Sequence, residues 1–170
     1  MVSKAPAQPE LAVAKGVWAV LETVMDPEIP VISVVELGIV RDLRAGAAGL
    51  EVVITPTYTG CPATRQIEED IRAALDAAGY GAVGLASELH PAWTTDWITP
   101  EGREQLRAFG IAPPEGKPGK RALFAAADPV QCPRCGSRHT ELVSEFGSTA
   151  CKSLWRCTAC REPFDYFKCL

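Results

Sequence analysis

The spacing of apolar residues predicts two helices and three strands in the first half of the chain. Helical spacing runs over residues 9–25 and again over 62–79. Between them, two β-like runs at 37–43 and 50–55 are separated by turn residues, which favours a hairpin. A third run, 82–89, follows the second helix, and this order favours a right-handed parallel crossover. We therefore expect a small α/β sandwich of the α+β class, with α-β-β-α-β order and a mixed sheet.

The apolar pattern weakens after residue 90. Residues 93–98 are expected to form a further edge segment of the sheet. A short helix should then begin at Thr99-Pro100, because proline suits the first turn of a helix. It should end near Gly110, because glycine is favoured just after a helix C-terminus.

Composition along the chain predicts its division into parts. Residues 1–8 are expected to be a disordered start, and 9–111 to form the α+β domain. The stretch 112–130 is rich in proline and glycine near its beginning, which is typical of a linker. Residues 131–170 would then form a second, smaller module.

Two pairs of cysteines in this second module predict a metal site. Cys132 and Cys135 form one CxxC pair, followed by Gly136, which suits a turn with positive φ. Cys157 and Cys160 form the second pair. Two such turns complete a tetrahedral shell of four sulfurs, so the pattern predicts a zinc ribbon. Short strands are expected around these turns, at 141–146, 153–156 and 164–167.

Zinc is the expected ion, and iron in a rubredoxin-like site would use the same four ligands. A module of about 40 residues has too small a core to fold unaided, so the metal should contribute to its folding. The alternative is a disulfide within the cysteine pairs. Because no secretory leader is evident and a cytoplasmic location is expected, the seven cysteines should be reduced. Of these, Cys151 and Cys169 are either incidental thiols or additional participants in the metal chemistry.

Cys61 lies between the end of a predicted strand and the start of the second helix. Backbone N–H groups and the helix dipole at such a position stabilise a thiolate. Thr55 and Thr57 precede it and could donate hydrogen bonds to a sulfur or an anion. The thiol is therefore either a structural residue or an exchangeable metal ligand.

An acidic loop containing Asp26 and Glu28 follows the first helix. Asp26 either caps backbone groups, which is the simpler interpretation, or faces Cys61 and helps to hold a metal or a partner. The two histidines, His90 and His139, are interpreted as structural.

Overall charge and hydropathy exclude several classes of partner. The net charge of −4 gives no basic field for nucleic acid. No apolar run approaches the roughly 18–20 residues that span a bilayer. The hydrophobic content of 47% is sufficient for a real core.

Three motifs give the first domain a family resemblance. Residues 26–30 (DPEIP), 36–40 (ELGIV) and 55–62 (TPTYTGCP) resemble the small domain of SufT-like iron–sulfur assembly proteins. The likeness extends over residues 9–110. Cys61 matches the cysteine of the family's T-x-T-x-x-x-C-P loop, and Asp26 and Glu28 match its acidic loop.

Later motifs resemble the PaaD component of the bacterial phenylacetyl-CoA epoxidase system. These are residues 93–98 (WTTDWI), 146–152 (FGSTACK) and 162–168 (EPFDYFK). The resemblance implies a place beside a di-iron oxygenase and a flavin/iron–sulfur reductase in aerobic phenylacetate degradation. The PaaD-like component would install or maintain an iron–sulfur or di-iron centre, holding a cluster transiently, and would not itself be an enzyme.

The residues themselves leave other functions open. No Glu-x-x-His pair and no dinucleotide-binding glycine loop is present, so redox chemistry would belong to partners. These partners would be the oxygenase and reductase subunits or the iron–sulfur assembly machinery. A second thiol beside Cys61 would come from a homodimer or from a partner. The alternatives are a docking scaffold without metal transfer, and a thiol enzyme that uses Cys61 as nucleophile.

Overall fold

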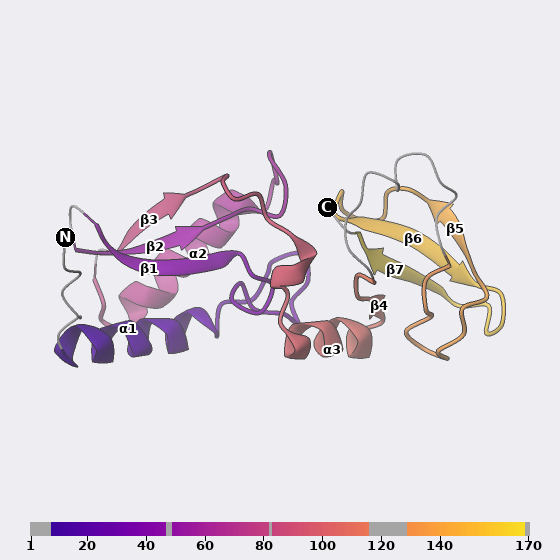
Figure 1. The fold of residues 1–170 in the computed structure, drawn as a ribbon, viewed down its shortest axis with the longest axis horizontal. Coiled ribbons are helices and arrows are strands. Elements are labelled where there is room, and N and C mark those ends of the chain that lie inside the picture. Colours follow the sequence, from indigo (N-terminus) through magenta and orange to yellow (C-terminus); the bar gives the residue numbers. More distant parts are fainter. Residues whose placement is uncertain (1–7, 47–48, 82, 116–128, 169–170) are drawn as a thin grey trace.

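A computed structural model describes residues 8–46, 49–81, 83–115 and 129–168. Cys169, residues 1–7 of the expected disordered start, and residues 116–128 of the expected linker lie outside the described residues. The described chain forms two sheets, one in each half of the sequence (Figure 1).

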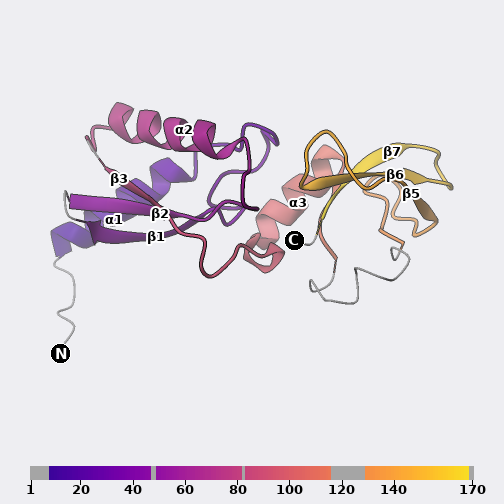
Figure 2. The same ribbon diagram turned by 90° about the horizontal axis from the view of Figure 1, so that it is seen from above.

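The first sheet has the expected mixed topology. Its strands β1 (Val40–Gly46), β2 (Gly49–Ile54) and β3 (Gly84–Ser87) lie in the order β1-β2-β3. β1 pairs with β2 antiparallel, and β2 pairs with β3 parallel. Helices α1 (Gln8–Leu21) and α2 (Thr64–Ala77) contact each other and cover the sheet (Figures 1 and 2). The predicted α-β-β-α-β order is confirmed.

Helix α2 shows how local sequence sets the fold. Ile67, Ile71 and Leu75 recur at helical spacing, and all three are buried. The helix ends in a Schellman motif, in which the Tyr80 N–H donates to the Leu75 carbonyl at 3.0 Å. Gly79 supplies the required positive φ of 81°. This end was predicted, whereas the helix begins at Thr64, two residues after the expected Pro62.

The segment after β3 differs from the prediction of an edge strand at 93–98. It forms a short 3₁₀ helix, η1 (Thr95–Trp97), whose first turn is capped by the Thr94 side chain. The Thr94 hydroxyl accepts a hydrogen bond from the Asp96 N–H at 3.3 Å. Such local bonds offer the backbone an alternative to strand pairing. Helix α3 (Pro100–Phe109) follows as predicted, with Thr99 at its N-cap and Gly110 in the left-handed conformation at its C-cap.

The second sheet contains the cysteine ribbon and one strand from outside it. Strands β5 (Thr140–Ser144), β6 (Lys152–Cys157) and β7 (Pro163–Phe167) correspond to the three expected short strands. They form antiparallel pairs. β4 (Ile111–Ala112) adds to β7 in parallel. Ala112, Pro113 and Pro114 are buried. The chain therefore enters the ribbon sheet before the expected linker begins at residue 112.

The two sheets share one hydrophobic core. Cys151 and Phe167, both from the ribbon half, belong to the cluster built mainly from the first domain. A smaller cluster inside the ribbon includes Cys132, Trp155 and Cys157. The two halves are thus joined by buried side chains as well as by the chain between them.

No helix in the described part of the chain is long and apolar enough to cross a membrane.

Candidate metal centre and thiol pocket

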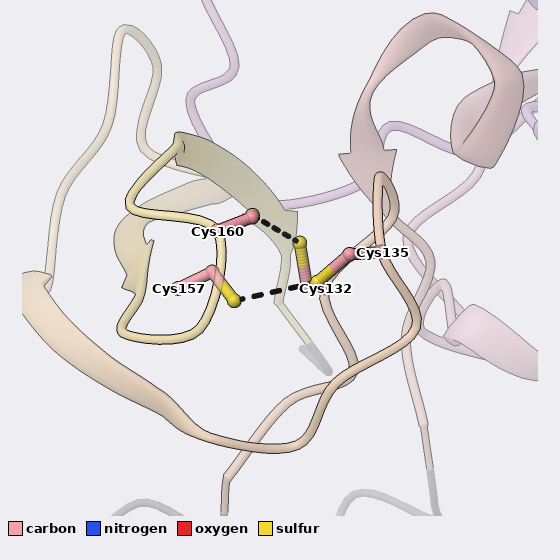
Figure 3. Close-up of side chains that lie close together, drawn as sticks. All are labelled: Cys132, Cys135, Cys157 and Cys160. Atoms are coloured by element: carbon pink, nitrogen blue, oxygen red, sulfur yellow. Dashed lines mark hydrogen bonds between the residues drawn. The ribbon is translucent and has the colours of Figure 1, made fainter.

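The four ribbon cysteines converge on one point. Their sulfurs all lie within 4.8 Å of one another. The Cys132 and Cys160 sulfurs are 3.8 Å apart, and those of Cys135 and Cys157 are 3.6 Å apart (Figure 3). In each of these two close pairs one cysteine is buried and the other exposed, so the cluster sits at the edge of the ribbon core.

These separations fit a tetrahedral metal. A shell of four sulfurs at about 2.3 Å from zinc places neighbouring sulfurs about 3.8 Å apart. A disulfide within a CxxC pair would hold its two sulfurs about 2.05 Å apart, whereas all four of these cysteines are free in the structure. Iron in an S4 site needs nearly the same spacing. The donor set therefore fits a single ion held by four thiolates, which would fix the two turns and the strands between them.

The backbone at both turns is arranged for this role. At the first turn, the Gly136 N–H donates to the Cys132 carbonyl at 2.9 Å, and Gly136 has a φ of 72°. At the second turn, the Cys157 N–H donates to the Glu162 carbonyl at 3.0 Å, and Arg161 has a φ of 67°. Tight turns of this kind aim both sulfurs of a CxxC pair at one ion.

A separate pocket collects the other predicted site residues. Cys61, Thr57, Asp26 and Glu28 all line it. Thr55 is buried beside it but is not among the lining residues. Cys61 is half-buried in the turn that leads into α2, and its carbonyl accepts a hydrogen bond from the Thr64 N–H at 3.2 Å. Because the helix begins only at Thr64, Cys61 precedes its first turn.

Asp26 has the capping role that the simpler interpretation expected. Its Oδ1 accepts hydrogen bonds from the N–H groups of Glu28 at 2.9 Å and Ile29 at 2.8 Å. It also lies at the pocket, so the capping and pocket roles coexist. Burial raises the pKa of the Asp26 carboxyl above its usual range, against the lowering effect of these two bonds. Burial, followed by the charge of Asp26, also raises the pKa of Glu28.

The ribbon half contributes a second thiol to this pocket. Cys151 is 5% exposed and lines the pocket together with Phe167. Its sulfur lies 3.0 Å from the Thr149 hydroxyl. Burial raises the pKa of the Cys151 thiol. No local signal in the sequence places this cysteine opposite Cys61, because the two are 90 residues apart in the chain and meet only through the packing of the two halves.

The pKa shifts around the pocket show which of these side chains influence one another. The pKa of Tyr58 is raised to about 12, first by burial and next by the neighbouring Cys61 thiolate, with smaller effects from Cys151 and Glu28. Lys152 is buried, with its Nζ 3.7 Å from Asp165. Its positive charge lowers the pKa values of Asp26, Glu28 and Cys151 against the effect of burial. The pocket therefore brings carboxyl and thiol groups together, within the electrostatic influence of the buried Lys152 ammonium.

Neither histidine belongs to the pocket. His90 and His139 are both exposed, and neither is among the lining residues. A cysteine nucleophile needs an adjacent general base. Among the described residues that line the pocket, the candidates for proton transfer are carboxylates and thiols alone.

Fold and site together define a class of protein, namely an iron–sulfur assembly domain joined to a four-cysteine ribbon. Residues 15–85 match the family model described as iron–sulfur cluster assembly protein, and residues 116–168 match that of the PaaD zinc beta ribbon domain. A relative from Escherichia coli (strain K12), named provisionally as one of the subunits of 1,2-phenylacetyl-CoA epoxidase, is 52% identical over 155 residues. That alignment covers 91% of this chain and 92% of the relative. The chain belongs to the PaaD family.

Two further relatives match the first domain. A protein of Porphyromonas gingivalis named Fe-S protein maturation auxiliary factor is 34% identical over 98 residues, covering 56% of this chain and 92% of that protein. The crystal structure of a DUF59 domain from Bacillus anthracis superposes with a TM-score of 0.52 at 26% identity. It covers 56% of this chain and 92% of its own. The assembly domain thus occurs as a nearly complete protein elsewhere, and the ribbon is an addition to it.

Proposed function

We propose that this protein is an accessory component that loads or maintains an iron centre, iron–sulfur or di-iron, for the phenylacetyl-CoA epoxidase system. It does not carry out the epoxidation. The observation that carries the proposal is the position of Cys61. Its thiol lies in the pocket of the assembly domain, beside the carboxylates of Asp26 and Glu28. The name of the Escherichia coli relative supports the link to the epoxidase system. The name of the Porphyromonas gingivalis relative supports the role in maturation.

The chemistry of the two cysteine sites favours a structural role for the ribbon and a carrier role for the Cys61 pocket. A closed shell of four thiolates holds its ion firmly and suits a structural zinc. A carrier must also release its cargo, which a site with few thiolates does more readily. Iron is the cargo in this scheme, and carboxylate oxygens and thiolate sulfurs are both ligands that it accepts. We assign zinc to the ribbon and iron to the Cys61 pocket.

A docking scaffold is the second candidate, and an exposed apolar strip on the ribbon favours it. Val143 and Phe146 are 56% and 67% exposed, at and just after β5. β5 is an edge strand of the ribbon sheet. Such an edge is a ready surface for pairing with another protein. In this scheme the oxygenase or reductase component would bind the strip, and Cys61 would be dispensable.

The two candidates separate in a co-production experiment. The oxygenase component is produced with the wild-type protein, with Cys61→Ser, with Thr59→Ala or without the protein, and its iron content is measured after purification. Thr59 is an exposed residue of the same loop and does not line the pocket. We expect full iron with wild type and Thr59→Ala, and at least a several-fold loss with Cys61→Ser. Full iron in the oxygenase produced with Cys61→Ser would favour the docking scaffold over the iron carrier. Full iron in the oxygenase produced without the protein would overturn the loading function.

A further inference from the structure

Two cysteines from different halves of the chain face the same pocket. Cys61 comes from the turn before α2, and Cys151 from the residue before β6. Both line it together with Asp26 and Glu28. Sequence reasoning expected a second thiol for Cys61 from a dimer or a partner. The fold supplies that thiol within the same chain.

The acidic neighbours of these thiols are suited to a cation, and the one buried ammonium that acts on them, that of Lys152, is paired with Asp165 at 3.7 Å. Asp26 and Glu28 line the pocket from the side of the first domain, and each acts electrostatically on Cys151. Two thiols and two carboxyls are four side chains able to bind a divalent transition ion. They lie farther apart than the ribbon cysteines, which are the one group of three or more such ligands within 4.8 Å among the described residues. Binding would therefore draw the pocket side chains together.

The size of the pocket limits what it can hold. Its cavity volume is about 20 Å³. A cavity of about 10–15 Å³ is needed to hold one water molecule, so this one has space for a single ion. Apart from Thr57 and Thr64, the remaining walls are aliphatic and aromatic side chains, including Ile29, Ile54 and Phe167. These exclude water and would slow the loss of a bound ion.

Strand β6 connects this pocket to the ribbon cysteines. Cys151 immediately precedes the strand, and Cys157 is its last residue. Six residues of extended chain span about 20 Å. A metal at Cys157 would fix the ribbon end of β6, and pairing with β7 fixes its register, from Lys152 opposite Phe167 to Arg156 opposite Pro163. The ribbon thereby holds Cys151 and Phe167 against the first domain.

We propose that Cys61 and Cys151 together bind one divalent iron ion at the junction of the two halves, with Asp26 and Glu28 as the adjoining carboxylates. This rests on the proposed function and specifies its cargo site. On binding, each thiol forms a sulfur–iron bond and releases its proton to solvent. The iron stays in the +2 state, and delivery to an acceptor reverses both steps. The ribbon is then part of the cargo site, because it supplies one of the two sulfurs.

Iron-edge X-ray absorption counts the sulfurs directly. The anaerobic chain is loaded with one equivalent of Fe²⁺ while its zinc content is held at one per chain. We expect two sulfurs around iron in the wild type, and one in each of Cys61→Ser and Cys151→Ser. Thr59→Ala is the matched control, because Thr59 is an exposed residue of the Cys61 loop that does not line the pocket, and it should keep two. In the wild-type chain, a trivalent arsenical that bridges neighbouring thiols should be mapped to Cys61 and Cys151 by mass spectrometry, which tests the pair without any variant.

The outcomes distinguish this inference from the proposed function. A single sulfur in the wild type, an unchanged count in Cys151→Ser, or a loss in Thr59→Ala overturns the two-thiol site. So does a shell of four sulfurs with loss of zinc, which would place iron in the ribbon. The oxygenase could still require Cys61 for its iron in each of these cases. Conversely, the wild type could show two sulfurs around iron while the oxygenase acquires its full iron without this protein. That result would overturn the proposed function and leave the two-thiol site standing.

Discussion

Trp93 and Phe167 pack against each other across the junction of the two halves, with ring centroids 5.9 Å apart and an angle of 54° between the ring planes. The Trp93 indole N–H donates to the Leu37 carbonyl at 3.1 Å, which anchors the ring in the first domain. Phe167 is the last residue of β7 and lines the thiol pocket. This aromatic pair therefore fastens the ribbon to the wall of the pocket that also holds Cys61.

Removal of the Phe167 ring should separate the two halves. Phe167 is 1% exposed, and truncation of a buried phenylalanine costs about 3–5 kcal/mol. Phe146→Ala is the matched control, because that ring is 67% exposed and its main contact is with the Lys168 ammonium 4.5 Å away. We expect the control to lose about 1 kcal/mol or less. Urea unfolding in zinc-containing buffer measures both, and equal losses would contradict the packing described here.

Gly38 should be far less tolerant of alanine than Gly79. Both have positive φ, at 75° and 81°, so each alanine carries a strain of about 1–2 kcal/mol. At Gly38 a new Cβ would also lie 2.7 Å from the Trp97 Cβ and 2.8 Å from its carbonyl oxygen, whereas nothing lies within 4 Å at Gly79. Crowding of this kind adds about 1–3 kcal/mol. Thermal unfolding of the two variants gives the difference, and a smaller loss at Gly38 would show that the loop relaxes freely.

Loss of one ribbon cysteine should abolish zinc binding without unfolding the first domain. Cys157→Ser removes a buried ligand at the end of β6. Because structural zinc contributes about 10–16 kcal/mol to small zinc-finger folds, we expect the ribbon strands to lose their protection from hydrogen exchange. The strands β1–β3 should keep theirs. Cys61→Ser should retain one zinc per chain, and loss of zinc from that variant would contradict the separation of the two sites.

Asp26→Asn should stabilise the chain at neutral pH when no iron is added. Asparagine keeps an oxygen that can accept the Glu28 and Ile29 N–H groups, which Asp26 now binds. Burial raises the pKa of Asp26 in the folded state, so the folded chain binds the proton more tightly than the unfolded chain does. The ionised carboxylate therefore lowers stability above that pKa, and its cost disappears as the pH falls through it.

The measurement is the free energy of unfolding of wild type and Asp26→Asn across the pH range in which zinc stays bound. We expect the advantage of asparagine to grow as the pH rises from the unfolded-state pKa of Asp26 towards its raised folded-state pKa, and to stay constant above that value. An asparagine variant that is less stable at neutral pH would mean that attraction to the buried Lys152 ammonium outweighs the cost of burial. A gain in stability together with weaker iron binding would identify Asp26 as a residue retained for function.

Features set by local sequence were predictable. The end of α2 at Gly79 and the cap of α3 at Thr99 follow from the conformational preferences of neighbouring residues. The parallel pairing of β2 with β3 follows from chain handedness. The convergence of Cys132, Cys135, Cys157 and Cys160 follows from the geometry of two CxxC turns.

Features set by distant contacts were not predictable in this way. Ile111–Ala112 is only two residues long, and it becomes a strand because β7 offers an unpaired edge. Cys151 has no periodic pattern around it, and its place opposite Cys61 depends on how the ribbon packs. Residues 93–98 carry a β-like composition, yet the Thr94 cap within the segment turns it into η1. In each case a tertiary or capping contact outweighed the local propensity.

Iron and zinc analysis of the same sample tests the central claim most directly. Wild type and Cys61→Ser are purified anaerobically, incubated with excess Fe²⁺, desalted, and assayed for both metals and for acid-labile sulfide. We expect one zinc per chain in both proteins, one further iron in the wild type and no sulfide. Cys61→Ser should lose its iron on desalting, because only one sulfur remains to hold the ion. Equal iron in the two proteins, or no iron in the wild type, would contradict a cargo site at Cys61.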